Sequence, residues 1–168
     1  NGLRVAAQRT GHQAAPLGSL AETVLARTEG LTGVQIDPGR RSARVGAGTL
    51  WGDLVPKASE QGLAALHGSA PTVCIAGYSL GGGVSFYGRK HGLGCNRVSA
   101  IELVGADGDL RRVDADNDPD LFWALRGGGG SFGVVTALEF DLLELPEIFA
   151  GALFFPAERA SEVLHAWH

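Results

Sequence analysis

The sequence predicts an α+β fold, because hairpins and short helices alternate along it without the regular βαβαβ rhythm of a doubly wound sheet. Two hairpin signals are clear: a Pro38-Gly39 turn follows "GVQID", and an Asp107-Gly108 turn interrupts "VSAIELVGADGDLRRVDA". The 168 residues, of which 45% are hydrophobic and 19% are charged, are sufficient for one domain with a buried core.

Short apolar runs predict the strands in chain order. Residues 3–7 and 23–27 indicate the first two strands, and residues 33–37 and 42–48 form the first hairpin, with apolar and polar residues alternating. The second hairpin spans residues 98–115. Two later strands are expected at residues 132–142 and 149–155.

Capping residues predict the helices. Thr49 is the expected N-cap of a helix that runs to about Gln61 and is ended by Gly62. A second helix begins with Asp118 as N-cap and Pro119 in the first helical position, and it ends in glycines.

The chain reads as helical again from Ala157. Trp51, Phe122 and Trp123 stand at helical spacings and are expected in the core, whereas the basic run from Arg89 to His91 is expected on a solvated helix end.

Charge and composition narrow the class of function. The net charge is −4 and the charges are interspersed, which favours neither nucleic acid nor an anionic membrane as a partner. No apolar run is long enough to span a bilayer, and the N-terminus does not read as a signal peptide, so we expect a cytoplasmic rather than a secreted protein. Cys74 and Cys95 form neither a disulfide framework nor a metal-site pattern.

"GYSLG" at residues 77–81 is a literal G-x-S-x-G, so one hypothesis is a serine hydrolase with Ser79 as nucleophile. Its partners in chain order would be one of the acids Asp107, Asp109 and Asp114 and one of the histidines His165 and His168. The motif should lead at once into a helix, yet three consecutive glycines follow, and each costs about 1 kcal/mol in a helix interior. The successive parallel strands of a hydrolase core are also missing, so the hydrolase is the weaker hypothesis.

A second literal motif, G-x-G-x-x-G from Gly128 to Gly133, has the wrong context for a Rossmann loop. That loop follows a strand and opens a helix, whereas here a helix precedes the glycines and a strand follows them. Three glycine-bearing loops then remain unexplained: "RTGHQA", "GYSLGGG" and "RGGGGSFG". Glycine permits close approach of the backbone, so together they favour a large, flat, phosphate-bearing cofactor.

"RTGH", "GSAPTVCIAGYSLGGGVSFYGRKHGL" and "DPDLFWALRGGGGSFGVVTALEF", in this order, resemble the FAD-binding domain of the berberine-bridge-enzyme-like oxidases, in the vanillyl-alcohol-oxidase superfamily. The resemblance covers residues 3–153. It implies a PCMH-type FAD-binding domain of two small α/β subdomains, incomplete at both ends. Residues 1–153 would be that domain without its first elements, and residues 154–168 would begin a substrate domain that is otherwise absent.

The resemblance also implies the site. His12 aligns with the histidine that links covalently to the flavin, and Ala70 replaces the cysteine that forms a second link in many members, so a single link is expected; Cys74 lies four residues further on and does not match that cysteine. Tyr78 stands where the family often has histidine, and His67 lies near the expected flavin edge with its role left open. The other expected FAD contacts are Arg9, Thr10, Gly11, Gln13, Ala14, Pro71, Thr72, Gly77, Gly81, Gly82, Gly83, Asn96, Val98, Gly130, Phe132, Gly133, Val134 and Val135.

By the same resemblance, the expected function is an FAD-dependent oxidase. Hydride would pass from a substrate C–H bond bearing a hydroxyl or amine to flavin N5, and O2 would reoxidise the flavin and yield H2O2. The partners would be O2 and a small molecule, and the catalytic base would lie outside this chain. The alternatives are the Ser79 hydrolase and a flavin-binding domain without catalysis.

Overall fold

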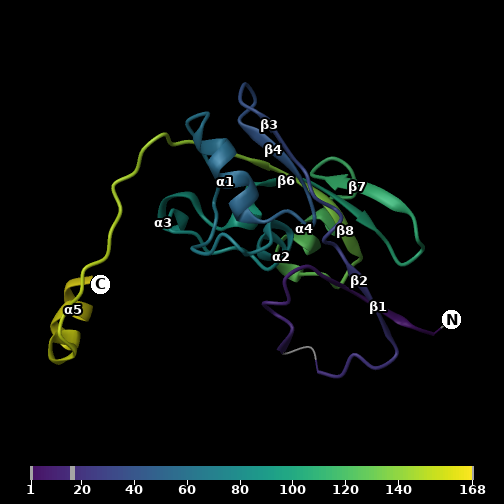
Figure 1. The fold of residues 1–168 in the computed structure, drawn as a ribbon, viewed down its shortest axis with the longest axis horizontal. Coiled ribbons are helices and arrows are strands. Elements are labelled where there is room, and N and C mark those ends of the chain that lie inside the picture. Colours follow the sequence, from purple (N-terminus) through teal and green to yellow (C-terminus); the bar gives the residue numbers. More distant parts are fainter. Residues whose placement is uncertain (1, 16–17, 168) are drawn as a thin grey trace.

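The centre of the molecule is a five-stranded antiparallel sheet in the order β3-β4-β8-β6-β7, as seen in the computed structural model, which describes residues 2–15 and 18–167 (Figure 1). Its strands are β3 (Val34–Asp37), β4 (Ser42–Gly46), β6 (Val98–Val104), β7 (Leu110–Asp114) and β8 (Val134–Asp141). Both predicted hairpins are confirmed, as β3–β4 and β6–β7. The fold is therefore α+β, as the sequence predicts.

The core lies between this sheet and three helices. Val45, Ile101, Leu103 and Leu138 come from the three central strands and are at most 1% exposed. The helices are α1 (Trp51–Ser59), α2 (Ile75–Leu80) and α4 (Pro119–Gly128). They bury Trp51, Leu54, Ile75, Phe122 and Leu125 against the sheet, whereas Trp123 is 74% exposed, so its predicted place in the core is wrong. Adjacent helical residues point about 100° apart, so one helix face does not bury both Phe122 and Trp123.

The predicted cap of α1 is also wrong. The N-cap is Leu50, and the Asp53 carboxylate accepts a hydrogen bond from the Leu50 N–H at 3.0 Å. The Thr49 hydroxyl instead accepts from the Gly33 N–H and donates to the Gly33 carbonyl, which ties the helix entrance to the β3 hairpin. The cap of α4 is confirmed, because Asp118 accepts a hydrogen bond from the Leu121 N–H at 3.4 Å.

The N-terminal region is a separate pair of parallel strands, β1 (Arg4–Gln8) and β2 (Thr23–Arg27). Both strands are predicted, but their parallel pairing is not. Val5 and Val24 are 61% and 49% exposed, although parallel strands are normally covered on both faces. Figure 1 shows this pair to the lower right of α2.

Short elements complete the body. The strands β5 (Leu63–Ala64) and β9 (Leu143–Glu144) pair with each other, and α3 (Gly88–His91) precedes the 3-10 helix η2 (Gly94–Arg97). Arg89 and Lys90 are exposed on α3, as predicted for the basic run, whereas His91 is half-buried.

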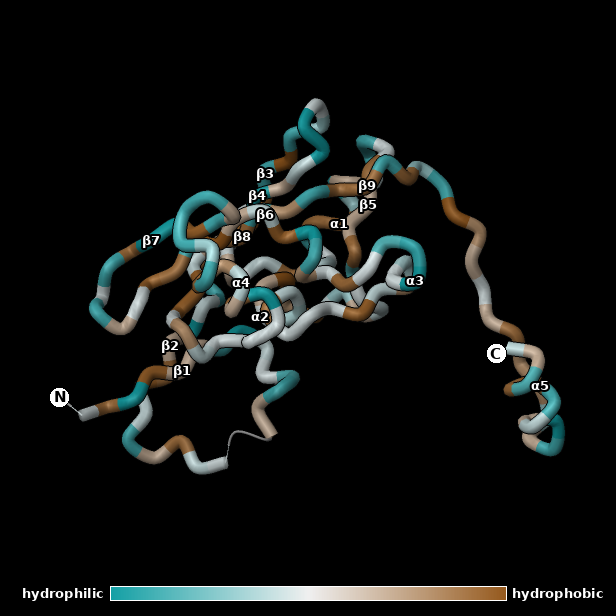
Figure 2. The backbone as a smooth tube through the Cα atoms, turned by 180° about the vertical axis from the view of Figure 1, so that it is seen from behind, coloured by the Kyte–Doolittle hydropathy of each residue, from teal (hydrophilic) through white to brown (hydrophobic). Residues whose placement is uncertain are grey.

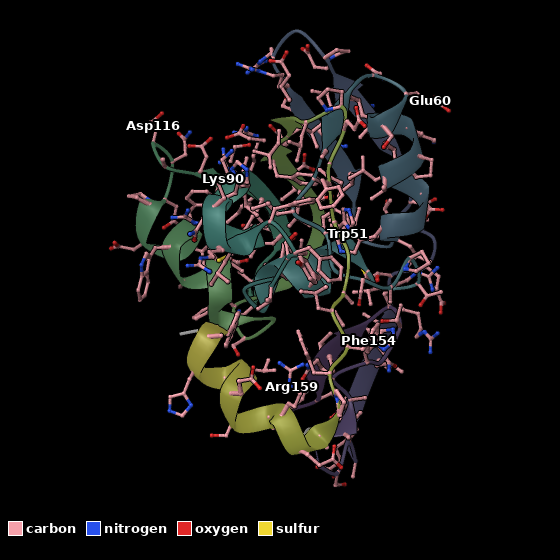
Figure 3. All side chains as sticks on the ribbon, turned by 90° about the vertical axis from the view of Figure 1, so that its left-hand side faces the viewer. Trp51, Glu60, Lys90, Asp116, Phe154 and Arg159 are labelled. Atoms are coloured by element: carbon pink, nitrogen blue, oxygen red, sulfur yellow. The ribbon has the colours of Figure 1, made fainter. Side chains whose placement is uncertain are left out.

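The C-terminal segment leaves the body. The strand expected at residues 149–155 is wrong: this stretch has no regular secondary structure, and Phe149, Leu153 and Phe154 are almost fully exposed. Helix is confirmed beyond it, as η3 (Ala157–Arg159) and α5 (Ala160–Trp167). Figure 2 shows the segment away from the body, and Figure 3, in which the segment passes in front of the body, labels Phe154 on the segment and Trp51 within the body. Among residues 2–15 and 18–167, no helix has the length and apolar character needed to cross a membrane.

Candidate FAD-binding site

The short helix α2 carries the central glycine motif. The loop predicted at Gly77, Tyr78 and Ser79 is wrong, because the chain turns into a helix at Ile75 after an isolated bridge between Leu50 and Cys74. Gly81 caps the helix, and Gly82 and Gly83 follow with φ of +109° and +78°. These two positive φ values need glycine, so the triple glycine is a turn that ends the helix.

Ser79 does not have the setting of a nucleophile. It is 4% exposed inside α2, and a turn rather than a strand precedes the helix. Asp114 is held in its own turn, where hydrogen bonds from the Asn117 side chain and from the Asp116 and Asn117 amides lower its pKa. His165 lies on α5, with Nδ1 2.6 Å from the Ser161 carbonyl oxygen, and His168 lies outside the described residues. The hydrolase hypothesis has no support here.

Backbone hydrogen bonds bring three predicted segments together around α2. The Gly94 N–H donates to the Gly83 carbonyl at 2.8 Å, and the Cys95 N–H donates to the Gly82 carbonyl at 2.9 Å. The Gly129 N–H donates to the Leu80 carbonyl at 3.0 Å. The glycine turn, the segment before β6 and the glycine run after α4 therefore form one surface.

Tyr78 is enclosed beside this surface. A Cβ added at Gly83, Gly94 or Gly68 would approach its ring to 2.5, 3.0 or 3.2 Å, and the Trp51 ring stands edge-on to it at 5.3 Å. Its hydroxyl is buried without a hydrogen-bond partner among the described residues. Burial raises the pKa of Tyr78 to about 12, so the phenol is neutral at physiological pH.

Buried polar atoms without a partner gather on elements that pack against α2. Within the described part of the chain they are Trp51 Nε1, Tyr78 Oη, Arg126 Nε and Thr136 Oγ1. Trp51 contacts Tyr78 directly, while Arg126 and Thr136 belong to α4 and β8, which both pack on α2. Such atoms are rare in folded proteins, and a group bound beside α2 could supply a partner to the Tyr78 hydroxyl.

Two glycines on this surface have no internal reason to be glycine. Gly77 lies inside α2 and Gly130 lies in the run after α4; neither has a positive φ, and a Cβ at either would meet no atom within 4 Å. A helical glycine destabilises by about 1 kcal/mol relative to alanine. Exposed glycines beside open space fit a flat ligand that approaches the backbone closely, so these residues fit FAD.

The loop with the expected flavin-linking histidine follows β1. Arg9 Nε donates to the Gly48 carbonyl at 2.9 Å, and the Ala14 N–H closes a turn onto the Gly11 carbonyl at 3.0 Å. Gly11 has φ of +77°, and Thr10, His12 and Gln13 are exposed. The turn therefore leaves the His12 imidazole exposed at the surface.

The remaining predicted contacts divide into exposed and buried residues. Pro71, Thr72 and Asn96 are exposed, Phe132 is 43% exposed, and Val134 is half-buried. Val98 and Val135 are each 5% exposed, so their side chains belong to the core and only their backbone could face a ligand. Gly133 is required internally, since a Cβ there would lie 2.6 Å from the Val104 carbonyl oxygen.

Trp51 and Arg126, which have unpartnered buried atoms on elements that pack against α2, are not among the site residues expected from the sequence. The only available signal for Arg126 is its position immediately before the run Gly127–Gly130. His67, whose role the sequence leaves open, bonds the Gly68 carbonyl through Nδ1 at 2.7 Å and meets Tyr87 edge-on at 5.8 Å. His67 and Tyr87 also line an open cavity of about 220 Å³ between α1 and residues 145–148.

Known proteins are similar to this chain in sequence and in fold. The family described as FAD binding domain matches residues 1–114. (R)-6-hydroxynicotine oxidase of Paenarthrobacter nicotinovorans is 36% identical over 163 residues, which are 97% of this chain and 36% of that protein. Among solved structures, glucooligosaccharide oxidase of Acremonium strictum has a TM-score of 0.78 at 33% identity, covering 87% of this chain and 31% of that one.

A variant of BBE-like 1 of Physcomitrella patens also has a TM-score of 0.78, at 32% identity, covering 84% of this chain and 31% of that one. The chain thus spans about a third of the length of the relatives it matches. The chain belongs to the FAD-binding domain family, and its fold is the PCMH-type FAD-binding domain of the berberine-bridge-enzyme-like oxidases.

Proposed function

We propose that this chain is the FAD-binding part of an FAD-linked oxidase. The observation that carries the proposal is the surface of α2, where Gly77 is exposed without an internal role and Tyr78 has a buried hydroxyl without a hydrogen-bond partner among the described residues. The named relatives include oxidases of 6-hydroxynicotine and of glucooligosaccharides, which supports oxidation of a small molecule. Bound FAD would accept hydride from the substrate and return the electrons to O2 as H2O2.

The residues of this chain would bind and orient the cofactor. The backbone along Gly77 and Gly130 leaves room for a flat group, and the His12 turn presents an exposed imidazole. The exposed aromatic residues of the C-terminal segment, Phe149, Phe154 and Trp167, support the proposal that residues 154–168 begin a substrate domain, because exposed apolar side chains are typical of an interface.

The covalent link is proposed to be single and to run through His12. Glucooligosaccharide oxidase of Acremonium strictum carries a 6-S-cysteinyl, 8α-N1-histidyl FAD. Here Ala70 stands at the position where the family resemblance places the cysteine, and the Cys74 thiol is buried and donates to the Ala47 carbonyl at 3.1 Å. The thiol is therefore engaged inside the fold.

Denaturation and peptide mapping of the full-length protein test the link. We expect one FAD on the peptide containing His12 and none on the peptide containing Cys74. The variant His12→Ala should release its flavin on denaturation, while the matched control His91→Ala should retain it. Covalent flavin that persists in His12→Ala would refute the link.

Oxidase activity is tested separately, by O2 consumption and H2O2 release with hydroxylated and amine substrates. Reduction of the bound flavin under anaerobic conditions should precede both signals. A protein that binds FAD but is not reduced by any substrate would favour the alternative of a flavin-binding domain without catalysis. A protein that binds no flavin would contradict the proposed function itself.

A further inference from the structure

Arg126 stands where helix α4 breaks. Its φ and ψ are −83° and 72°, outside the helical range, and Gly127 follows with φ of +123°. The guanidinium carbon lies 4.3 Å from the centre of the Phe122 ring, so the aromatic face supports one side of the charge. The side chain is half-buried, and its Nε is enclosed without an acceptor among the described residues.

This arrangement is incomplete within the chain. A guanidinium is always charged and has five donors, and an enclosed donor without an acceptor destabilises the fold. Arg9, in the loop after β1, is already engaged, because its Nε donates to the Gly48 carbonyl and its Nη1 lies 3.8 Å from Glu29. Among the described arginines, Arg126 is the one with a buried donor atom that has no acceptor.

The neighbours of Arg126 indicate where that partner comes from. The Gly129 N–H bonds the Leu80 carbonyl, which joins the run Gly127–Gly130 to the end of α2. A Cβ at Gly127, Gly129 or Gly130 would meet no atom within 4 Å, so the backbone beside Arg126 borders open space. A fixed cation beside an open, glycine-lined surface fits an anion, and arginine binds phosphate through charge-assisted hydrogen bonds.

We propose that Arg126 binds a phosphate oxygen of the FAD diphosphate. The inference rests on the proposed function, because it takes FAD as the occupant of the α2 surface. Phe122 is a positioning residue in this account, since its ring supports the guanidinium. Neither Arg126 nor Phe122 is among the FAD contacts expected from the family resemblance.

Reversible flavin binding to the full-length protein tests the inference. The His12→Ala background removes the proposed covalent link, so that dissociation constants can be measured by flavin fluorescence. Arg126→Met is compared with Arg89→Met, an exposed arginine on α3, and each is titrated with FAD and with riboflavin, which has no phosphate. Arg126→Met should weaken FAD binding about tenfold or more, as expected for loss of a charge-assisted hydrogen bond, and should leave riboflavin binding unchanged.

Two further measurements distinguish a direct role of Arg126 in phosphate binding from a structural role. Arg126→Lys should restore part of the FAD affinity, and high salt should weaken FAD binding less in Arg126→Met than in its parent. Equal weakening of FAD and riboflavin binding, with a lower unfolding temperature before flavin is added, would overturn the proposal and give Arg126 a purely structural role. Unchanged FAD affinity would overturn it as well. Failure of the parent to bind either flavin would instead contradict the proposed function.

Discussion

The turn at Gly46–Gly48 and the helix α2 both contain glycine, but for opposite reasons. At the turn, a Cβ on Gly46 or Gly48 would overlap the carbonyl oxygens of Leu31 and Thr28, so the fold itself excludes any side chain. In α2, a Cβ on Gly77 would meet only open space. The first region is determined by internal packing, whereas the second leaves open space beside the backbone at Gly77. This difference distinguishes glycines that the fold itself requires from those proposed to contact the cofactor.

The largest effect is expected from Gly48→Ala. The new methyl group would push against the backbone of Thr28, and overpacking of this kind destabilises by about 3 kcal/mol. Thermal or denaturant unfolding measures the loss. Gly30→Ala is the matched control, because a Cβ there meets no atom within 4 Å. Equal stability of the two variants would contradict the assignment of Gly48 to packing.

Gly77→Ala should separate stability from binding. Alanine favours a helix by about 1 kcal/mol over glycine, so the free energy of unfolding without flavin should stay the same or rise. FAD affinity, measured in the His12→Ala background, should fall about tenfold because the methyl group would occupy space meant for the ligand. The control Gly88→Ala, on α3, should keep its FAD affinity. Unchanged affinity in Gly77→Ala would remove α2 from the site.

Tyr78→Phe tests, through the pH dependence of the free energy of unfolding, whether the Tyr78 hydroxyl on α2 is buried. The folded-state pKa of Tyr78 is raised to about 12 by burial, above the usual value of 10.0. The neutral phenol is thus fully compatible with folding below pH 10, and stability is lost as the pH rises from about 10 towards 12, where the unfolded chain ionises first. Tyr78→Phe should lose less stability across this window than the parent. Parallel curves for Tyr78→Phe and the parent would show that the hydroxyl is exposed.

The smallest loss of stability is expected from Arg44→Gln, on the exposed face of the five-stranded sheet. Arg44 donates to Glu102 Oε1 through Nε at 3.1 Å and through Nη2 at 2.6 Å, but both side chains are partly exposed. Arg44→Gln should therefore lower the free energy of unfolding by less than about 1 kcal/mol, and less in high salt. Glu102→Gln and the double variant complete a cycle that isolates the pair. A coupling well above that value would mean that this face is covered.

Local signals in the sequence predict most elements of the body. The β6–β7 hairpin follows from Asp107-Gly108, and the start of α4 follows from Asp118 and Pro119, because these turn and cap preferences act within a few residues. The Thr49 cap fails because a partner distant in sequence, Gly33, takes its hydroxyl. Tertiary contacts of this kind leave no local trace.

The site is predicted less completely than the fold. The glycine loops are visible in the sequence, but the enclosure of Tyr78 and the missing partner of Arg126 depend on packing between α2 and its neighbours. The strand expected at residues 149–155 is wrong because an apolar run indicates that a segment is buried, but not which part of the protein covers it. Its exposed side chains are the feature that a second domain would explain.

Hydrogen–deuterium exchange on full-length His12→Ala, with and without added FAD, tests the central claim most directly. If FAD lies against α2, the amides of residues 75–83 and 127–135 should exchange more slowly with FAD, while the hairpin at residues 105–110 should not change. Protection confined to other parts of the protein, with these two segments unaffected, would contradict the assignment of the α2 surface as the cofactor site.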